Sequence, residues 1–156
     1  MKHYLSTLRK GFTLIELLVV IGILAVLLAI TLIAINPARQ FSQANNTKRS
    51  SDVNAILNAV DQFAADNKGA LPTNMPAAGT VATIGNGALE ADICADLVTR
   101  YLAALPVDPL VNNGTPISDC VVGGSTGYTI VRSATDNRVT VAAPSQELGA
   151  VISVTR

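Results

Sequence analysis

The longest apolar run of the chain lies near its start and predicts a membrane-spanning helix. It extends over residues 17–35, nineteen positions without a charged side chain. As an α-helix rising about 1.5 Å per residue, this run covers about 30 Å, the thickness of the hydrocarbon core of a bilayer. A buried core helix has a similar composition, but the rest of so short a chain offers little surface to surround one.

A second, periodic pattern follows Asn36-Pro37 and predicts an amphipathic helix. Its apolar residues recur at steps of three and four, which places them on one helical face. Charged residues such as Lys48 and Arg49 fall mainly off this stripe. The stripe comprises Phe41, Ala44, Val53, Ile56, Leu57, Val60, Phe63 and Ala64.

The two patterns together predict one long helical spine. We expect Pro37 to bend or loosen the helix rather than end it, because it removes one backbone hydrogen bond. Read through this bend, residues 12–67 would form a spine of about 80 Å. The sequence 67–69, Asn-Lys-Gly, followed by Pro72, indicates where the spine ends.

The remainder of the chain predicts a small antiparallel sheet. Three β-rich segments close the chain, and residues 134–137 supply a turn between the first two. So small a sheet needs a helix over one face, and the apolar stripe can cover it. The fold class is therefore α+β, a long helix on a sheet of about three strands. We expect strands at 128–132, 139–142 and 151–155, a short helix at 88–104, and loops at 69–87 and 106–127.

Charge is balanced overall, with 11 basic and 11 acidic side chains, but it is unevenly distributed. Lys2, Arg9 and Lys10 precede the apolar run, which predicts a cytoplasmic N-terminus and an exported remainder. Without residues 1–11 the chain has 8 basic and 11 acidic side chains. Because the other basic residues are scattered and Trp is absent, we expect no direct nucleic-acid binding.

Two cysteines, Cys94 and Cys120, lie in the predicted exported part. An oxidising compartment favours a disulfide between them, with two buried thiols as the alternative. Their spacing does not match a metal motif, and His3 is the only histidine. The sequence contains no catalytic constellation, and the glycine-rich residues 123–127 lack the lysine of a phosphate-binding loop. We therefore expect no enzyme, no metal and no cofactor.

The order of the first segments distinguishes this chain from an ordinary secreted protein. A secretory signal has its small-residue cleavage site after the apolar core. Here a short basic segment ends in Gly11, before the apolar run. Cleavage at this glycine would therefore keep the membrane segment in the mature protein.

The string Lys10-Gly-Phe-Thr-Leu-Ile-Glu-Leu17 resembles the processing site of type IV pilins and of type II secretion pseudopilins. The resemblance is strong over residues 9–35. It implies that a prepilin peptidase cuts between Gly11 and Phe12 and N-methylates Phe12. It further implies assembly with other copies and related pilins, by a membrane platform with an ATPase. The resulting segments are a leader (1–11), a transmembrane and filament-core helix (12–36), an amphipathic continuation (37–68) and a head (69–156).

Glu16 is the one charged residue expected inside this membrane helix. A carboxylate there costs about 2.5–3.5 kcal/mol on insertion scales and is usually retained for a function. The only cation within reach on its own helix after cleavage is the new amino group of Phe12. The family resemblance implies that Glu16 pairs with this amine of a neighbouring subunit. Alternatively, Glu16 lies close enough to the membrane edge to reach water.

The sequence favours a structural subunit of an extracellular pilus-type filament, which is a single-pass cytoplasmic-membrane protein before assembly. A major pseudopilin of a periplasmic secretion pseudopilus is the alternative, because residues 105–109 resemble a stretch that precedes the sheet in that group. Those proteins often bind calcium, but Asp108, Asp119 and Asp136 show no dense ligand spacing. An internal disulfide is more typical of pilins. A third possibility is a membrane-tethered binding module that never polymerises.

Overall fold

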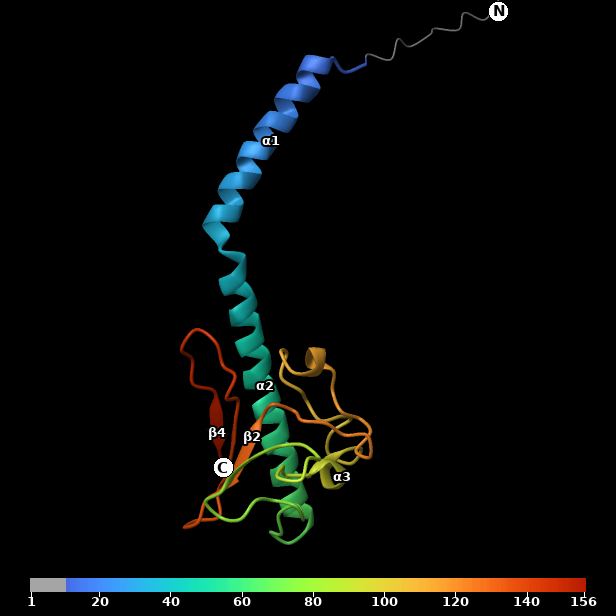
Figure 1. The fold of residues 1–156 in the computed structure, drawn as a ribbon, viewed down its shortest axis with the longest axis vertical. Helices are drawn as coiled ribbons and strands as arrows, with labels where there is room; N and C mark the ends of the chain where they lie inside the picture. The colour runs from blue at the N-terminus through green and yellow to red at the C-terminus, as the bar shows by residue number, and fades with distance from the viewer. Residues whose placement is uncertain (1–10) are drawn as a thin grey trace, which may run out of the picture. The chain divides into compact units, whose positions relative to one another are not determined.

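A computed structural model describes residues 11–156, so residues 1–10 of the predicted leader lie outside the described part (Figure 1). The chain forms two compact units that divide between Gln40 and Phe41. The elements are helix α1 (Leu14–Ile35), helix α2 (Pro37–Asp66), strand β1 (Val81–Thr83), helix α3 (Cys94–Leu97), the 3-10 turn η1 (Asn112–Gly114), and strands β2 (Thr129–Arg132), β3 (Val139–Ala142) and β4 (Ser153–Thr155). The predicted α+β fold is confirmed.

The predicted spine is interrupted at Asn36. This residue adopts a left-handed conformation, with φ 45° and ψ 80°, which ends α1. Its carbonyl and its side-chain oxygen accept hydrogen bonds from the backbone N–H of Arg39, at 3.1 and 3.3 Å, and so start α2. The prediction of one bent helix is therefore wrong at this point. Pro37 disfavours a helical conformation at the residue before it, and asparagine tolerates the left-handed region better than most residues.

Helix α2 supplies the apolar stripe that the sequence predicts. Val53, Ile56, Leu57 and Val60 are fully buried against the head. Arg49 is buried as well, so its predicted position off the stripe is wrong. It precedes Val53 by four residues, and residues four apart share a helical face.

The end of α2 lies where the sequence predicts it. Helical geometry stops at Asp66, and Lys68 and Gly69 have positive φ values of 57° and 89°. The Gly69 N–H then donates to the Ala64 carbonyl at 2.8 Å. This bond satisfies one of the carbonyls left free at a helix C-terminus.

The sheet is antiparallel, with strand order β1-β2-β3-β4. Strands β2, β3 and β4 correspond to the three predicted strands. The register pairs Ile130 with Val141, and both side chains are fully buried in the core between sheet and α2. Strand β1 is an addition within residues 69–87, which the sequence predicted as loop. Three residues are too few to produce a periodic signal of their own.

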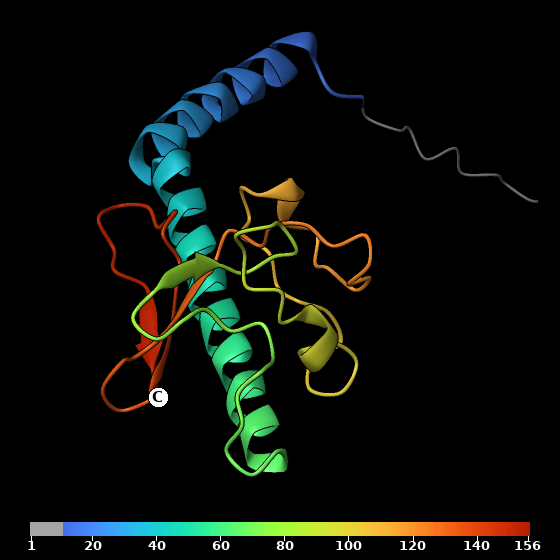
Figure 2. The same ribbon diagram turned by 60° about the horizontal axis from the view of Figure 1, so that its bottom comes forward.

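The helix predicted over residues 88–104 is reduced to the four residues of α3. Leu89, which contributed to the predicted spacing, is 93% exposed. The Ala91 N–H instead donates to the Thr83 carbonyl at 2.7 Å, which ties this segment to the sheet edge. The segments that carry α3 and η1 lie on the other side of α2 from β4 in both views (Figures 1 and 2).

Candidate functional site

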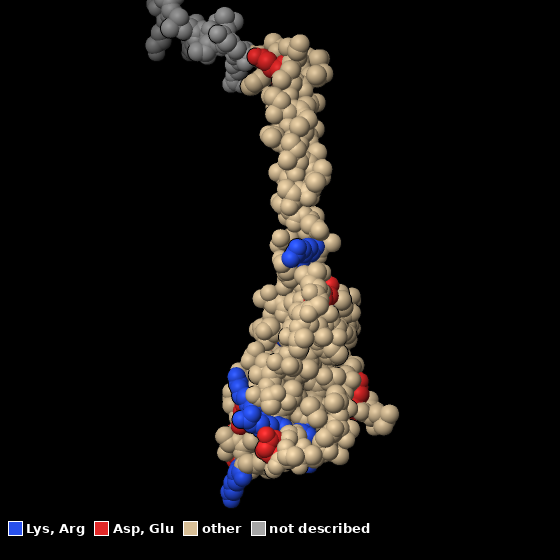
Figure 3. All heavy atoms as spheres, turned by 90° about the vertical axis from the view of Figure 1, so that its left-hand side faces the viewer, with Lys and Arg blue, Asp and Glu red and all other residues tan. Residues whose placement is uncertain are grey.

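Helix α1 is apolar on every side, and none of its residues is buried by the rest of the chain. In the part of the chain that the structure describes, it is the one helix long and apolar enough to cross a membrane. Figure 3 shows no charged side chain along it on that face, except an acidic one near its start. Among the described residues of its own compact unit, no other helix or strand covers α1. An apolar surface of this size calls for a partner outside the chain, lipid or protein.

Glu16 lies in the first turn of α1 and bonds back to Thr13. The Thr13 backbone N–H and hydroxyl both donate to Glu16 Oε2, at 2.8 and 2.7 Å. The Glu16 backbone N–H donates to Thr13 Oγ1 at 3.3 Å. This reciprocal arrangement is a capping box, which satisfies backbone donors that a helix N-terminus leaves free.

Thr13 is a residue that our sequence reasoning missed. The signal was present, because a threonine followed three residues later by glutamate is the capping-box pattern. Thr13 gives the Glu16 carboxylate neutral hydrogen-bond donors but no positive charge. Helix capping thus explains the position of Glu16 at the start of α1 and leaves its charge without a counter-ion among the described residues.

The predicted cleavage site lies just outside the helix. Gly11, Phe12 and Thr13 are exposed and precede the first helical residue, Leu14. A side-chain carbon added at Gly11 would meet no atom within 4 Å. The fold therefore does not require glycine here, and a requirement for it must come from a molecule that handles this segment.

A family model for the prokaryotic N-terminal methylation motif matches residues 7–32. The chain carries this motif, the signature of type IV pilins and pseudopilins. This motif supports a pilin-like or pseudopilin-like protein and does not distinguish between the two. No curated protein and no solved structure shows a significant match to the chain.

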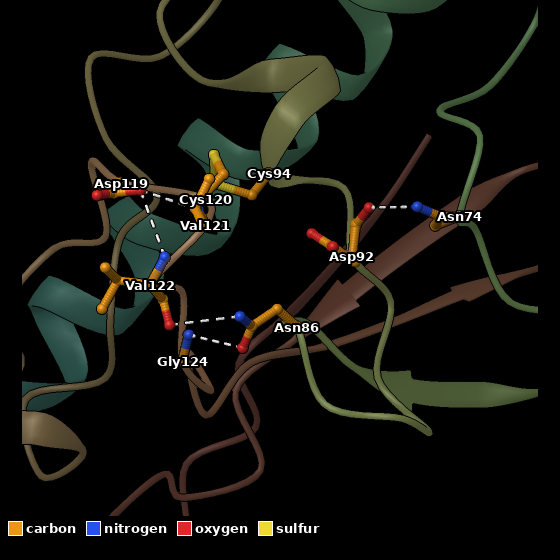
Figure 4. The surroundings of a disulfide bond; sticks show 9 residues. All are labelled: Asn74, Asn86, Asp92, Cys94, Asp119, Cys120, Val121, Val122 and Gly124. Carbon is orange, nitrogen blue, oxygen red and sulfur yellow. Dashed lines mark hydrogen bonds between the residues drawn. A yellow bond between two sulfur atoms is a disulfide. The ribbon is translucent and has the colours of Figure 1, made fainter.

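In the head, Cys94 and Cys120 form a disulfide with a Cα–Cα distance of 5.5 Å. The bond joins α3 to the long loop before β2 (Figure 4). Next to it, Asn86 donates to the Val122 carbonyl at 3.4 Å and accepts from the Gly124 N–H at 2.9 Å. The disulfide and Asn86 together fasten a loop that has little regular structure of its own.

Loss of this disulfide should lower the stability of the head. The bond closes a loop of 26 residues, for which chain entropy gives about 3.5 kcal/mol. We expect the Cys94→Ser/Cys120→Ser variant to lose about 2–4 kcal/mol of unfolding free energy in urea denaturation. A Ser125→Ala variant, in the segment between Cys120 and β2, is the control. Equal stability of the double-serine variant and the wild type would contradict the expectation.

A buried ion pair connects α2 to the loop after α3. Arg49 Nε donates to Asp108 Oδ2 at 2.7 Å and Nη2 donates to Oδ1 at 3.2 Å. Both side chains are fully buried. The hydrogen bond to Asp108 raises the pKa of Arg49 above its usual value. The guanidinium is therefore charged throughout the accessible pH range.

The same guanidinium connects to the β3–β4 loop through Glu147. Arg49 Nη1 donates to Glu147 Oε2 at 2.8 Å, and Asn45 and Ser42 donate to the same carboxylate at 3.0 and 2.9 Å. The Asn46 side-chain amide donates to the Glu147 carbonyl at 2.7 Å and accepts from the Glu147 backbone N–H at 3.0 Å. The hydrogen bonds from Asn45, Arg49 and Ser42, in decreasing order of effect, hold the pKa of the Glu147 carboxyl below its usual value. The arrangement fixes two loops of the head to α2.

Glu147 should make the head acid-sensitive. Because its pKa is lower in the folded state, its contribution to stability is present above pH 4.5, the ordinary value, and disappears as the pH falls through the folded-state pKa. We expect the unfolding free energy of the wild type to fall more steeply with acid below this pH than that of Glu147→Gln. Urea denaturation of both proteins from about pH 6 to pH 3 measures this difference in unfolding free energy. Carboxyl groups titrate over about this range. Parallel curves for the two proteins would refute the role of Glu147.

The aspartates considered for calcium do not converge on one site. Asp108 is paired with Arg49, Asp119 accepts the backbone N–H groups of Val121 and Val122, and Asp136 lies 3.7 Å from Arg138. Within residues 11–156, no cluster of three or more His, Cys, Asp or Glu side chains is placed to hold a metal ion.

Proposed function

We propose that this chain is the structural subunit of an extracellular type IV pilus-type filament. The observation that supports this most strongly is helix α1. It is apolar all round, it is not buried by its own chain, and its methylation motif places one carboxylate in the first turn. A helix that is apolar on every side can contact lipid in a membrane and identical helices in a bundle.

In this proposal the chain is first a single-pass protein of the cytoplasmic membrane with its N-terminus inside. A prepilin peptidase removes residues 1–11 by cutting between Gly11 and Phe12, and methylates the new amino group of Phe12. The exposed, non-helical position of Gly11 and Phe12 supports access of a peptidase to this bond. A membrane platform with an ATPase then transfers α1 from lipid into the filament.

Glu16 and the Phe12 amine then set the stagger between neighbouring subunits. Removing one partner of a desolvated ion pair leaves an uncompensated charge, which costs several kcal/mol. Only the stagger that brings a Glu16 carboxylate to a Phe12 amine neutralises both groups. The bonds from Thr13 support this role, since they fix the carboxylate at the helix start and leave its charge available.

Mass spectrometry of surface filaments sheared from the native host tests this function. We expect an abundant chain that begins at N-methylated Phe12 and contains the Cys94–Cys120 disulfide. A chain that retains Met1, and is found only in the membrane fraction, would support a tethered binding module and overturn the proposal. A processed chain confined to the periplasm would support a secretion pseudopilus.

The pseudopilin alternative rests on residues 105–109 and makes a separate prediction about calcium. Because Asp108 in this stretch is already neutralised by Arg49, we expect calcium chelation to change neither the melting temperature of the head nor filament length. Thermal unfolding with excess EGTA and with added CaCl₂ measures the first, and electron microscopy measures the second. A calcium-dependent rise in melting temperature of several degrees would favour the pseudopilin.

A further inference from the structure

Strand β4 forms an outer edge of the sheet and leaves a row of backbone groups unpaired (Figures 1 and 2). On its inner side, Val139 and Arg156 exchange two backbone hydrogen bonds, at 2.7 and 3.0 Å, and the Ala143 N–H donates to the Ile152 carbonyl at 2.9 Å. Backbone groups along an antiparallel strand point to alternate sides, so every second residue points away from β3. These outward residues are Val151, Ser153 and Thr155. Within residues 11–156, no hydrogen bond fills their outward N–H and C=O groups.

The two edges of the sheet differ in their protection. At the β1 edge, the Ala91 N–H donates to the Thr83 carbonyl at 2.7 Å, and Ala91 forms a bridge with Ile84, so the segment before α3 covers this edge. Residues 151–155 at the other edge, Val-Ile-Ser-Val-Thr, contain no charged residue and no proline. Natural proteins commonly use such residues to block an open edge. The β4 edge is therefore a template for pairing with another strand.

The side chains of β4 limit which strand fits there. Ile152 and Val154 pack against the core but are only partly buried, whereas Val151, Ser153 and Thr155 are exposed. An added strand should therefore carry apolar residues on the core side and tolerate exposure on the other. The β4 strand of a second copy has this same alternation. Antiparallel pairing through this edge keeps both apolar rows on one side of the joined sheet, whereas parallel pairing through it would turn one sheet over.

We propose that β4 pairs antiparallel with β4 of a second copy of this chain, across a two-fold axis at Ser153. The facing pairs are then Ser153 with Ser153, Val151 with Thr155, Ile152 with Val154, and Arg156 with Ala150. All outward backbone groups of the edge find partners in this register. No like charges face each other, and Arg156 keeps its contact with Asp61. The proposal depends on the head alone and does not require that the chain assemble into a filament.

Charge substitutions at Ser153 test this pairing in the full-length chain in detergent micelles. The Ser153 side chain is exposed in the single chain, but in the pair it faces itself, where two like charges are unfavourable. We expect the wild type to dimerise below about 1 mM, and Ser153→Lys and Ser153→Glu each to dimerise at least about ten-fold more weakly. An equimolar mixture of these two variants should recover dimers, because lysine then faces glutamate. Sedimentation equilibrium in a density-matched detergent buffer measures each case.

The matched control is Ser118→Lys, which makes the same change at an exposed position on the loop after η1. It should dimerise like the wild type. Association through α1 would be unaffected by any of these substitutions, so the comparison separates the two modes of association.

Hydrogen exchange of individual amides, measured by NMR, adds a second readout. The N–H groups of Ser153 and Thr155 should exchange more slowly as the concentration of the wild type rises, and should show no such dependence in Ser153→Lys. Equal dimerisation of Ser153→Lys and the wild type, or a mixture of the two variants that stays monomeric, would overturn the proposal. A wild type that stays monomeric throughout would overturn it as well and would leave the edge to a strand of another protein.

Discussion

Replacing Glu16 with glutamine is expected to reduce the yield of sheared filaments at least ten-fold, while the amount of protein in the membrane stays the same. Glutamine keeps the size of the side chain and an oxygen that accepts from Thr13, so the start of α1 is preserved. It removes only the negative charge that we assign to pairing with the Phe12 amine of a neighbour. The desolvated amine would then remain unpaired, which costs about 3–5 kcal/mol.

Two further variants separate this pairing from helix capping. Thr13→Val removes the hydroxyl that bonds to Glu16 and keeps the carboxylate, so filament yield should fall by much less than in Glu16→Gln. Thr31→Val removes another hydroxyl of α1, which bonds to the Leu28 carbonyl, and should leave yield unchanged. Immunoblots of sheared filaments and of membranes measure both quantities. Normal filament yield from Glu16→Gln would refute the pairing.

The sequence predicted those features of the helices and the head whose signal lies in a pattern of neighbouring residues. Nineteen uncharged positions define the apolar segment of α1, and steps of three and four define the stripe of α2. Both signals lie in neighbouring residues and need no knowledge of the fold. The N-terminal methylation motif is local too, which is why the family model finds it within residues 7–32.

The features that sequence did not predict depend on residues far apart in the chain. Arg49 is buried only because Asp108, 59 positions later, is folded against it. Strand β1 exists because β2 offers it a partner, with Thr83 opposite Thr129. Thr13 is different, since its capping pattern was legible in the sequence.

Arg49→Met is expected to lower the unfolding free energy of the head by about 3–5 kcal/mol, the cost of leaving one member of a buried ion pair alone. Methionine fills much of the volume of the arginine stem, so loss of packing contributes less than loss of charge. The variant leaves Asp108, which is fully buried, without its cation. Glu147, whose side chain is 28% exposed, can turn to water instead.

The matched control is Arg100→Gln, which removes an exposed ion pair with Asp66. The side chains of that pair are 69% and 49% exposed, and exposed pairs contribute about 0–1 kcal/mol. Urea denaturation of the full-length chain, followed by circular dichroism in detergent micelles, compares the two. Equal destabilisation by both variants would show that burial of Arg49 does not matter.

The double variant Arg49→Met/Asp108→Leu tests the cause of the loss. If the cost comes from the uncompensated Asp108 charge, removing that charge as well should recover much of the stability, since buried ion pairs are often replaceable by apolar residues. Recovery of stability should not restore every contact, because Glu147 would still lack its bond from Arg49. Hydrogen exchange in the β3–β4 loop should therefore remain faster than in the wild type, which separates the stabilising effect of the pair from its role in fastening this loop to α2.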